Sequence, residues 1–190
     1  MRAVQVDREQ PAVTASSNPS PVEIRQSSLD ELRTWLAEEP NSLFAVLDAC
    51  DEPRVPDVVC RLGPRAVCLY RSKAEEEYSQ IAPYLARVDE AMLDWIVENL
   101  WEAPWGIFAV ASTDLAGLRT HFRRFLKVEG PDGKELLFRF YDPRVLPTFL
   151  PTCTEAEAAE FFGPVGRFCV TGEEGDLLSI ERAAAAVEDQ

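Results

Sequence analysis

The sequence has little of the material from which catalytic centres are usually built. Its single histidine is His121, so a Ser-His-Asp or Cys-His site would have to use that residue, and a metal site with two or more imidazoles is excluded. Sequence patterns for a nucleophile elbow, a phosphate-binding loop or a dinucleotide-binding turn do not occur. We interpret His121, which lies in an arginine-rich helical stretch, as an exposed or partly packed helix residue.

Paired cysteines are also missing. The five cysteines are odd in number and include no C-x-x-C pair, which argues against a disulfide framework and against a zinc ribbon. Cys50 and Cys68 end or lie within apolar runs, which predicts that they are buried as small apolar side chains. Reduced thiols point to the cytoplasm.

Long apolar stretches are absent as well. No segment approaches the roughly 20 apolar residues of a membrane helix, and the first 28 residues lack the apolar centre of a signal peptide. We predict a flexible leader at residues 1–27, because proline and serine recur there without apolar periodicity. Residues 28–180 form the predicted single domain, and residues 181–190 a frayed alanine-rich helix. Together these features predict a cytoplasmic protein.

Positive charge is scarce. The formal net charge is −14 and the sequence pI is about 4.5. An acidic chain repels phosphate backbones and anionic lipid surfaces, which argues against nucleic acid and membranes as partners.

The apolar residues are arranged in short runs that alternate between strand and helix periodicity. The predicted strands are residues 42–50, 66–70, 81–88, 106–111, 135–141, 167–171 and 177–180. The predicted longer helices are residues 28–39, 89–101, 115–126 and 154–163. Because hairpin signals interrupt the alternation, the pattern favours an α+β fold, with a mixed sheet, helices packed on it and short hairpins in one compact domain. An α/β fold is the alternative.

Local signals refine this prediction. Ser28 and Thr154 each precede a glutamate by three residues, the pattern of a capping box at a helix start. Pro83 cannot donate a ladder hydrogen bond, which favours an edge position for the strand at 81–88. Asp142 followed by Pro143 is typical of an N-cap and the first residue of a helix.

Residues 113–144 stand out electrostatically. They hold seven of the 19 basic residues and five acids, so this segment carries +2 while the rest of the chain carries −16. A basic region on an acidic molecule can orient an acidic partner surface. Alternatively, its arginines pair with acids in the same chain as weak surface ion pairs. The basic residues are Arg119, Arg123, Arg124, Lys127, Lys134, Arg139 and Arg144.

Seven sequence words occur in an order that resembles a known family. They are LFAVLDAC (43–50), CLYR (68–71), IAPYLARV (81–88), WGIFAVAS (105–112), LRTHFRRFLKV (118–128), PDGKELLFRFYDPRVLPTFLPT (131–152) and EFFGPVGRF (160–168). This order resembles the adaptor or chaperone domain of bacterial type VI secretion, long filed as a domain of unknown function and now called Tap or TEC.

The resemblance implies a non-enzymatic cytoplasmic adaptor that binds a toxic effector and helps to load it onto the VgrG spike. It implies no catalytic residue, metal or cofactor. The recurring family positions correspond to Arg123, Arg124 and Phe125, and to Arg139, Tyr141, Asp142, Pro143 and Arg144. From these positions and the neighbouring Arg119 we take a predicted partner-binding set. Its members are Arg119, Arg123, Arg124, Arg139, Tyr141, Asp142 and Arg144.

Two other functions remain open from the sequence. An immunity-type protein that plugs a toxin also suits an acidic composition. A hydrolase would have to use scattered carboxylates or His121, and two distant carboxylates leave no local signature.

Overall fold

The computed structural model describes residues 20–40, 42–70, 77–129, 133–172 and 175–183. Most of the predicted leader and the end of the predicted tail lie outside these residues. The strands are β1 (Val22–Ser27), β2 (Leu43–Asp48), β3 (Ala66–Cys68), β4 (Pro83–Arg87), β5 (Gly106–Ala111), β6 (Lys127–Glu129), β7 (Glu135–Leu137), β8 (Val165–Thr171) and β9 (Leu177–Arg182). The α-helices are α1 (Leu29–Glu38), α2 (Val55–Leu62), α4 (Glu90–Asn99), α5 (Leu115–Phe122), α6 (Leu146–Phe149) and α7 (Glu155–Phe162). Short 3-10 turns cover Gly63–Arg65, Ser79–Ile81 and Leu150–Thr152.

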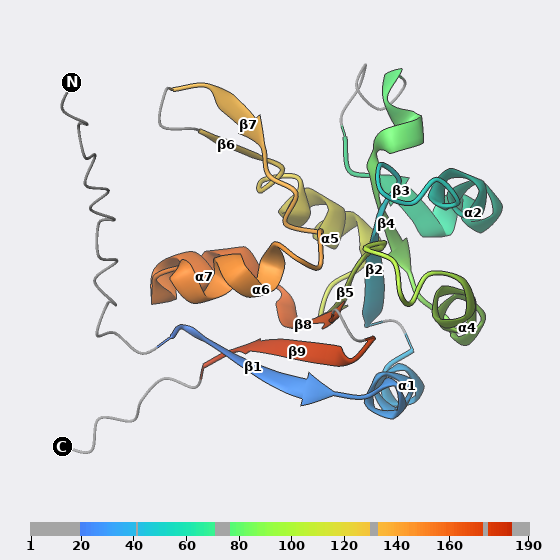
Figure 1. The fold of residues 1–190 in the computed structure, drawn as a ribbon, viewed down its shortest axis with the longest axis horizontal. Coiled ribbons are helices and arrows are strands. Elements are labelled where there is room, and N and C mark those ends of the chain that lie inside the picture. The colour runs from blue at the N-terminus through green and yellow to red at the C-terminus, as the bar shows by residue number, and fades with distance from the viewer. Residues whose placement is uncertain (1–19, 41, 71–76, 130–132, 173–174, 184–190) are drawn as a thin grey trace, which may run out of the picture.

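One seven-stranded sheet organises the molecule, in the order β1-β9-β8-β5-β2-β4-β3. Each of its pairings is antiparallel. The predicted α+β class is confirmed, with helices packed on the sheet (Figure 1).

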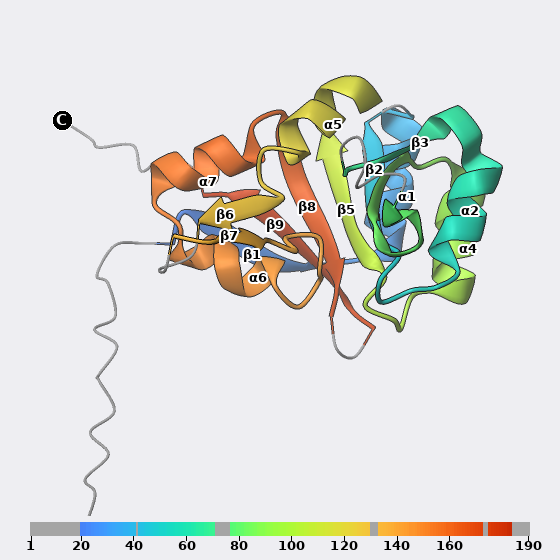
Figure 2. The ribbon, with the colours of Figure 1, turned by 90° about the horizontal axis from the view of Figure 1, so that it is seen from above.

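Both faces of the sheet are covered, which explains why β2 is apolar from Leu43 to Leu47. Phe44 and Val46 pack into one core with α5, α6 and α7, while Ala45 and Leu47 pack into the other with α1, α2 and α4. Successive strand residues point to opposite faces, so a strand in the middle of two cores needs apolar side chains at every position. Figures 1 and 2 show the two helical layers and the small β6–β7 hairpin.

The two ends of the described chain form one edge of the sheet. Val22 to Ser27 pairs residue by residue with Arg182 to Leu177. The leader prediction is therefore wrong for residues 22–27, and the tail prediction is wrong for Glu181 and Arg182, which extend β9. Each segment gains a ladder of backbone hydrogen bonds from the other, a long-range partner that no local pattern reveals.

The other edge also differs from the prediction. β4 lies between β2 and β3, so β3 is the edge strand and β4 is not. Pro83 is tolerated because it is the first residue of β4.

The helix starts follow the local signals closely. The side chains of Ser28, Asp89, Asp114 and Thr154 each accept a backbone N–H at a helix N-terminus, and Thr154 and Glu157 form the complete capping box. The short hairpins that the sequence predicts are present as β6–β7 and β8–β9. Strand β7, predicted to cover residues 135–141, is shorter and ends at Leu137.

Two further predictions, the end of α5 and the burial of Cys50, need correction. Helix α5 ends at Phe122, although Phe125 and Leu126 continue its apolar spacing, because residues 123–125 form a turn that leads into β6. Cys50 is exposed, since it lies in the turn after β2, whereas Cys68 is buried as expected.

Candidate functional site

Arg119 and Arg123 of the predicted partner-binding set hold the edge of the sheet. Nε of Arg119 donates to the carbonyl of Cys68 at 3.0 Å. The guanidinium of Arg123 donates to the carbonyls of Cys68 at 3.1 Å, Leu69 at 2.9 Å and Tyr70. The planar guanidinium, with five N–H donors, suits several carbonyls at once. These contacts supply partners to backbone groups at the end of the edge strand β3.

Arg124, the neighbour of Arg123, lies on the surface. It forms an ion pair with Glu160 of α7, and the two side chains are 55% and 60% exposed. Its guanidinium carbon lies 5.5 Å from the ring centroid of Phe125. Lys127 and Glu135 make a similar exposed pair across the β6–β7 hairpin, at 2.5 Å. Pairs of this kind contribute little to stability.

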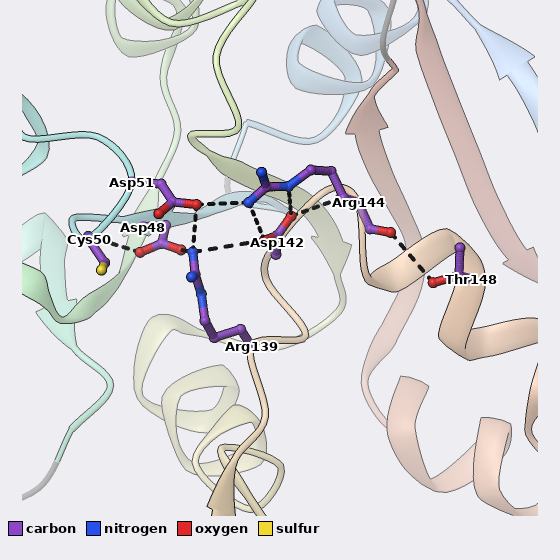
Figure 3. A network of polar contacts seen from close by, with 7 residues as sticks. All are labelled: Asp48, Cys50, Asp51, Arg139, Asp142, Arg144 and Thr148. Atoms are coloured by element: carbon purple, nitrogen blue, oxygen red, sulfur yellow. Dashed lines mark hydrogen bonds and ion pairs between the residues drawn. The ribbon is translucent and has the colours of Figure 1, made fainter.

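Arg139 and Arg144 belong to a cluster of five charged side chains, which we call the ionic cluster: Asp48, Asp51, Arg139, Asp142 and Arg144 (Figure 3). Nη2 of Arg139 donates to Asp48 and, at 2.8 Å, to Asp51. Nη2 of Arg144 donates to the same oxygen of Asp51 at 2.8 Å. The cluster thereby ties the segment between β7 and α6 to the end of β2.

Asp142 organises a turn within this cluster. Its carboxylate accepts the backbone N–H of Arg144 at 2.9 Å and the Nε of Arg144 at 2.8 Å. Its backbone carbonyl accepts the N–H groups of Val145 and Leu146. The prediction of Asp142 as helix N-cap is therefore wrong: α6 begins only at Leu146, and Asp142 caps the turn that precedes it. Asx residues stabilise such turns by bonding to the backbone two residues on.

Burial and charge act against each other in the ionic cluster. The Asp48 side chain is 1% exposed, and its burial raises the pKa above the usual value despite the hydrogen bond from Arg139. Burial also raises the pKa of Asp142, but the bonds from Arg144 outweigh it and leave the pKa below its usual value. Nε of Arg139 is buried without a hydrogen-bond partner among the described residues.

Tyr141 is a core residue. It is 1% exposed, packs edge-on against Phe140 with the ring centroids 5.5 Å apart, and hydrogen bonds with Tyr70. Burial raises the pKa of its phenol, so the hydroxyl stays protonated. This side chain positions the segment that carries Arg139 and Asp142.

The excess positive charge of residues 113–144 is thus largely matched inside the molecule. In the ionic cluster, two arginines face three aspartates, a formal charge of −1. Sequence reasoning missed Asp48 and Asp51, which come from a distant segment. The one available signal was Asp48 itself, since an acid at the end of an otherwise apolar buried strand requires a partner.

His121 is buried rather than exposed. Its Nε2 lies 2.7 Å from the carbonyl oxygen of Phe161, and its ring packs against Phe122 and Phe125. Burial lowers the pKa of His121 and outweighs the effect of the Phe161 carbonyl. The adjacent Gly163 has φ of 50°, and a Cβ there would lie 2.4 Å from Cε1 of His121. The imidazole therefore serves helix packing between α5 and α7.

A wide groove lies elsewhere, at the end of the sheet where β2 begins and β4 and β5 end. This groove has a volume of about 1060 Å³. Of the predicted partner-binding residues, Arg119 lines it. Its other charged lining residues are Glu39, Arg65, Arg87 and Asp114.

The arrangement defines an α+β domain in which an antiparallel sheet is fastened at one edge and one end by arginine side chains. Residues 43–160 match a family described as a domain of unknown function (DUF4123). The match covers 118 of the 190 residues, and the chain belongs to this family. Searches of curated proteins and of solved structures found no match.

No helix in the described part of the chain has both the length and the apolar character that a bilayer crossing requires.

Proposed function

We propose that this protein is a cytoplasmic adaptor of type VI secretion, which binds a toxic effector and helps to load it onto the VgrG spike without catalysing a reaction itself. The supporting observation is the ordered series of sequence words, which falls largely within the family match at residues 43–160. The words lie on β2, β3, β4, β5, α5, the segment that carries the ionic cluster and β8, so they fall on the sheet and on elements packed against it.

The geometry divides the predicted partner-binding residues into two groups. Arg119, Arg123, Arg139, Tyr141 and Asp142 make contacts inside the fold. Arg124 and Arg144 have more exposed side chains, at 55% and 59%. A partner that contacts the predicted set would therefore reach these two guanidinium groups first.

The decisive experiment is capture with the tagged full-length chain from the native bacterium, followed by mass spectrometry. We expect a VgrG protein and a toxin encoded nearby to be recovered together. Recovery of neither would contradict the proposal. An Arg124→Glu variant tests the exposed arginine outside the ionic cluster and should capture less of both partners than Arg33→Glu on α1, a matched exposed control.

A toxicity assay separates the adaptor from an immunity protein. In cells that express the captured toxin, an adaptor leaves growth inhibition in place, and its deletion abolishes secretion of the toxin. Rescue of growth on co-expression would identify an immunity protein instead. Secretion that persists after deletion would also contradict the adaptor proposal.

A further inference from the structure

The groove at the end of the sheet is lined by the sheet itself and by three other segments. Phe44, Val67, Arg87 and Ala111 contribute from four neighbouring strands, β2, β3, β4 and β5. One wall is the N-terminal half of α5, with Leu115, Ala116 and Arg119, and another is the turn at Pro64 and Arg65. The end of α1, at Glu39 and Pro40, completes the lining.

The groove differs in charge from the molecule as a whole. Its lining contains three arginines, Arg65, Arg87 and Arg119, against two acids, Glu39 and Asp114, in a chain of net charge −14. Arg65 pairs with Asp89, but both side chains are almost half exposed, at 42% and 49%. An exposed pair of this kind costs little to exchange for another carboxylate.

The groove is also apolar between these charges. Val67 and Leu115 are half-buried at its surface, and Pro40, Pro64 and Ala116 are exposed. Its volume of about 1060 Å³ lies at the upper limit of the usual range for a small-molecule pocket and leaves room for a peptide segment. A duplex or single-stranded nucleic acid would bring many phosphates against a chain of −14, which is unfavourable.

We propose that this groove binds a segment of the partner protein that combines apolar side chains with carboxylates, the carboxylates facing Arg65, Arg87 and Arg119. The inference rests on the proposed adaptor function and gives the partner segment its chemistry. Charge complementarity requires the bound segment to carry negative charge. Its apolar side chains would be buried against the apolar lining between the ion pairs.

Two variants test the groove by different physical routes. Arg87→Glu reverses an exposed charge in the lining, and Ala116→Trp fills the space from the exposed first turn of α5. Their matched controls are Arg182→Glu, on the exposed end of β9, and Thr120→Trp, one turn further along α5 and outside the lining. Thermal unfolding of each variant shows whether the fold is intact.

The probes are a short synthetic peptide of alternating glutamate and leucine and a counterpart with lysine in place of glutamate, titrated against the full chain by fluorescence anisotropy. We expect the glutamate peptide to bind and the lysine peptide not to bind. Arg87→Glu should weaken binding by about tenfold or more and flatten its salt dependence, because a like charge replaces an attraction. Ala116→Trp should weaken it at every salt concentration, and both controls should bind as wild type does.

Equal binding of the lysine peptide, or unchanged affinity in folded Arg87→Glu and Ala116→Trp variants, would overturn the groove proposal. Capture of the effector and VgrG by those same variants would then leave the adaptor function standing. Failure of the wild-type chain to capture either protein would instead remove the adaptor function, whatever the peptides do.

Discussion

The ionic cluster and the surface pairs Arg124–Glu160 and Lys127–Glu135 all join basic side chains to carboxylates, but in different surroundings. Arg139 and Asp51 approach to 2.8 Å, and Lys127 and Glu135 to 2.5 Å. Yet the Asp48 side chain in the cluster is 1% exposed, whereas Glu135 is 65% exposed. Water screens the surface pair and replaces either partner when the other is lost, but it does not reach Asp48. Burial, rather than the distance between the charged atoms, therefore determines which ion pairs stabilise this fold and which contribute little.

The largest expected effect follows from removal of Arg139. Arg139→Ala leaves the buried Asp48 carboxylate without its main partner and should destabilise the protein by about 3 kcal/mol, near the lower end for broken buried pairs because Arg139 is itself one-third exposed. Urea unfolding measures the change. The double variant Asp48→Asn, Arg139→Gln should recover much of the loss, because it removes both charges together. A double variant less stable than Arg139→Ala alone would contradict this explanation.

A smaller effect is expected at the sheet edge, where adjacent arginines provide an internal control. Arg123→Ala removes donors from the carbonyls of Cys68, Leu69 and Tyr70 and should cost about 1 to 3 kcal/mol. Arg124→Ala removes only an exposed pair and should change stability by less than about 0.5 kcal/mol. The measurement is the urea midpoint of each variant. Equal losses would mean that the β3 contacts carry no special weight.

A third comparison concerns the pH dependence of stability, which we expect to depend on the buried His121 more than on the exposed ion pairs. Burial holds the pKa of His121 below the usual value of 6.5, so the unfolded chain binds more protons in the interval between the two pKa values. Stability should therefore decrease as pH falls through about 6.5 toward the folded-state pKa. Urea unfolding from about pH 7.5 to pH 5 measures this slope. His121→Gln should flatten it, and an unchanged slope would contradict the assignment to His121.

The smallest effect is expected on the hairpin. Lys127→Ala removes the exposed pair with Glu135 and should shift stability by less than about 0.5 kcal/mol, with any difference disappearing at high salt. Thermal unfolding at low and high salt is sufficient to measure it. A loss as large as that of Arg139→Ala would erase the distinction between the two regions.

Local patterns predicted those parts of the fold that local physics determines. The caps at Ser28 and Thr154 and the buried strand β2 could be predicted because each depends on a few neighbouring residues. The antiparallel partner of β1 lies at the opposite end of the chain and leaves no trace in the composition of either strand.

The candidate site shows the same limit more sharply. Net charge along the sequence predicted a basic region at residues 113–144, but Asp48 and Asp51 join that region only in three dimensions. The groove likewise gathers Glu39, Arg65, Arg87 and Arg119 from elements that are far apart in the chain. Charge counting within a sequence window cannot anticipate partners from outside the window.

The pairing of β1 with β9 has a consequence for how the molecule is made. The first described strand finds its only neighbour in the last, with Val22 opposite Arg182. During synthesis, β1 leaves the ribosome before all the other described strands, and that edge closes only after β9 has been translated. Such a non-local closure slows folding, and it leaves the nascent chain with an open sheet edge until the last strand emerges.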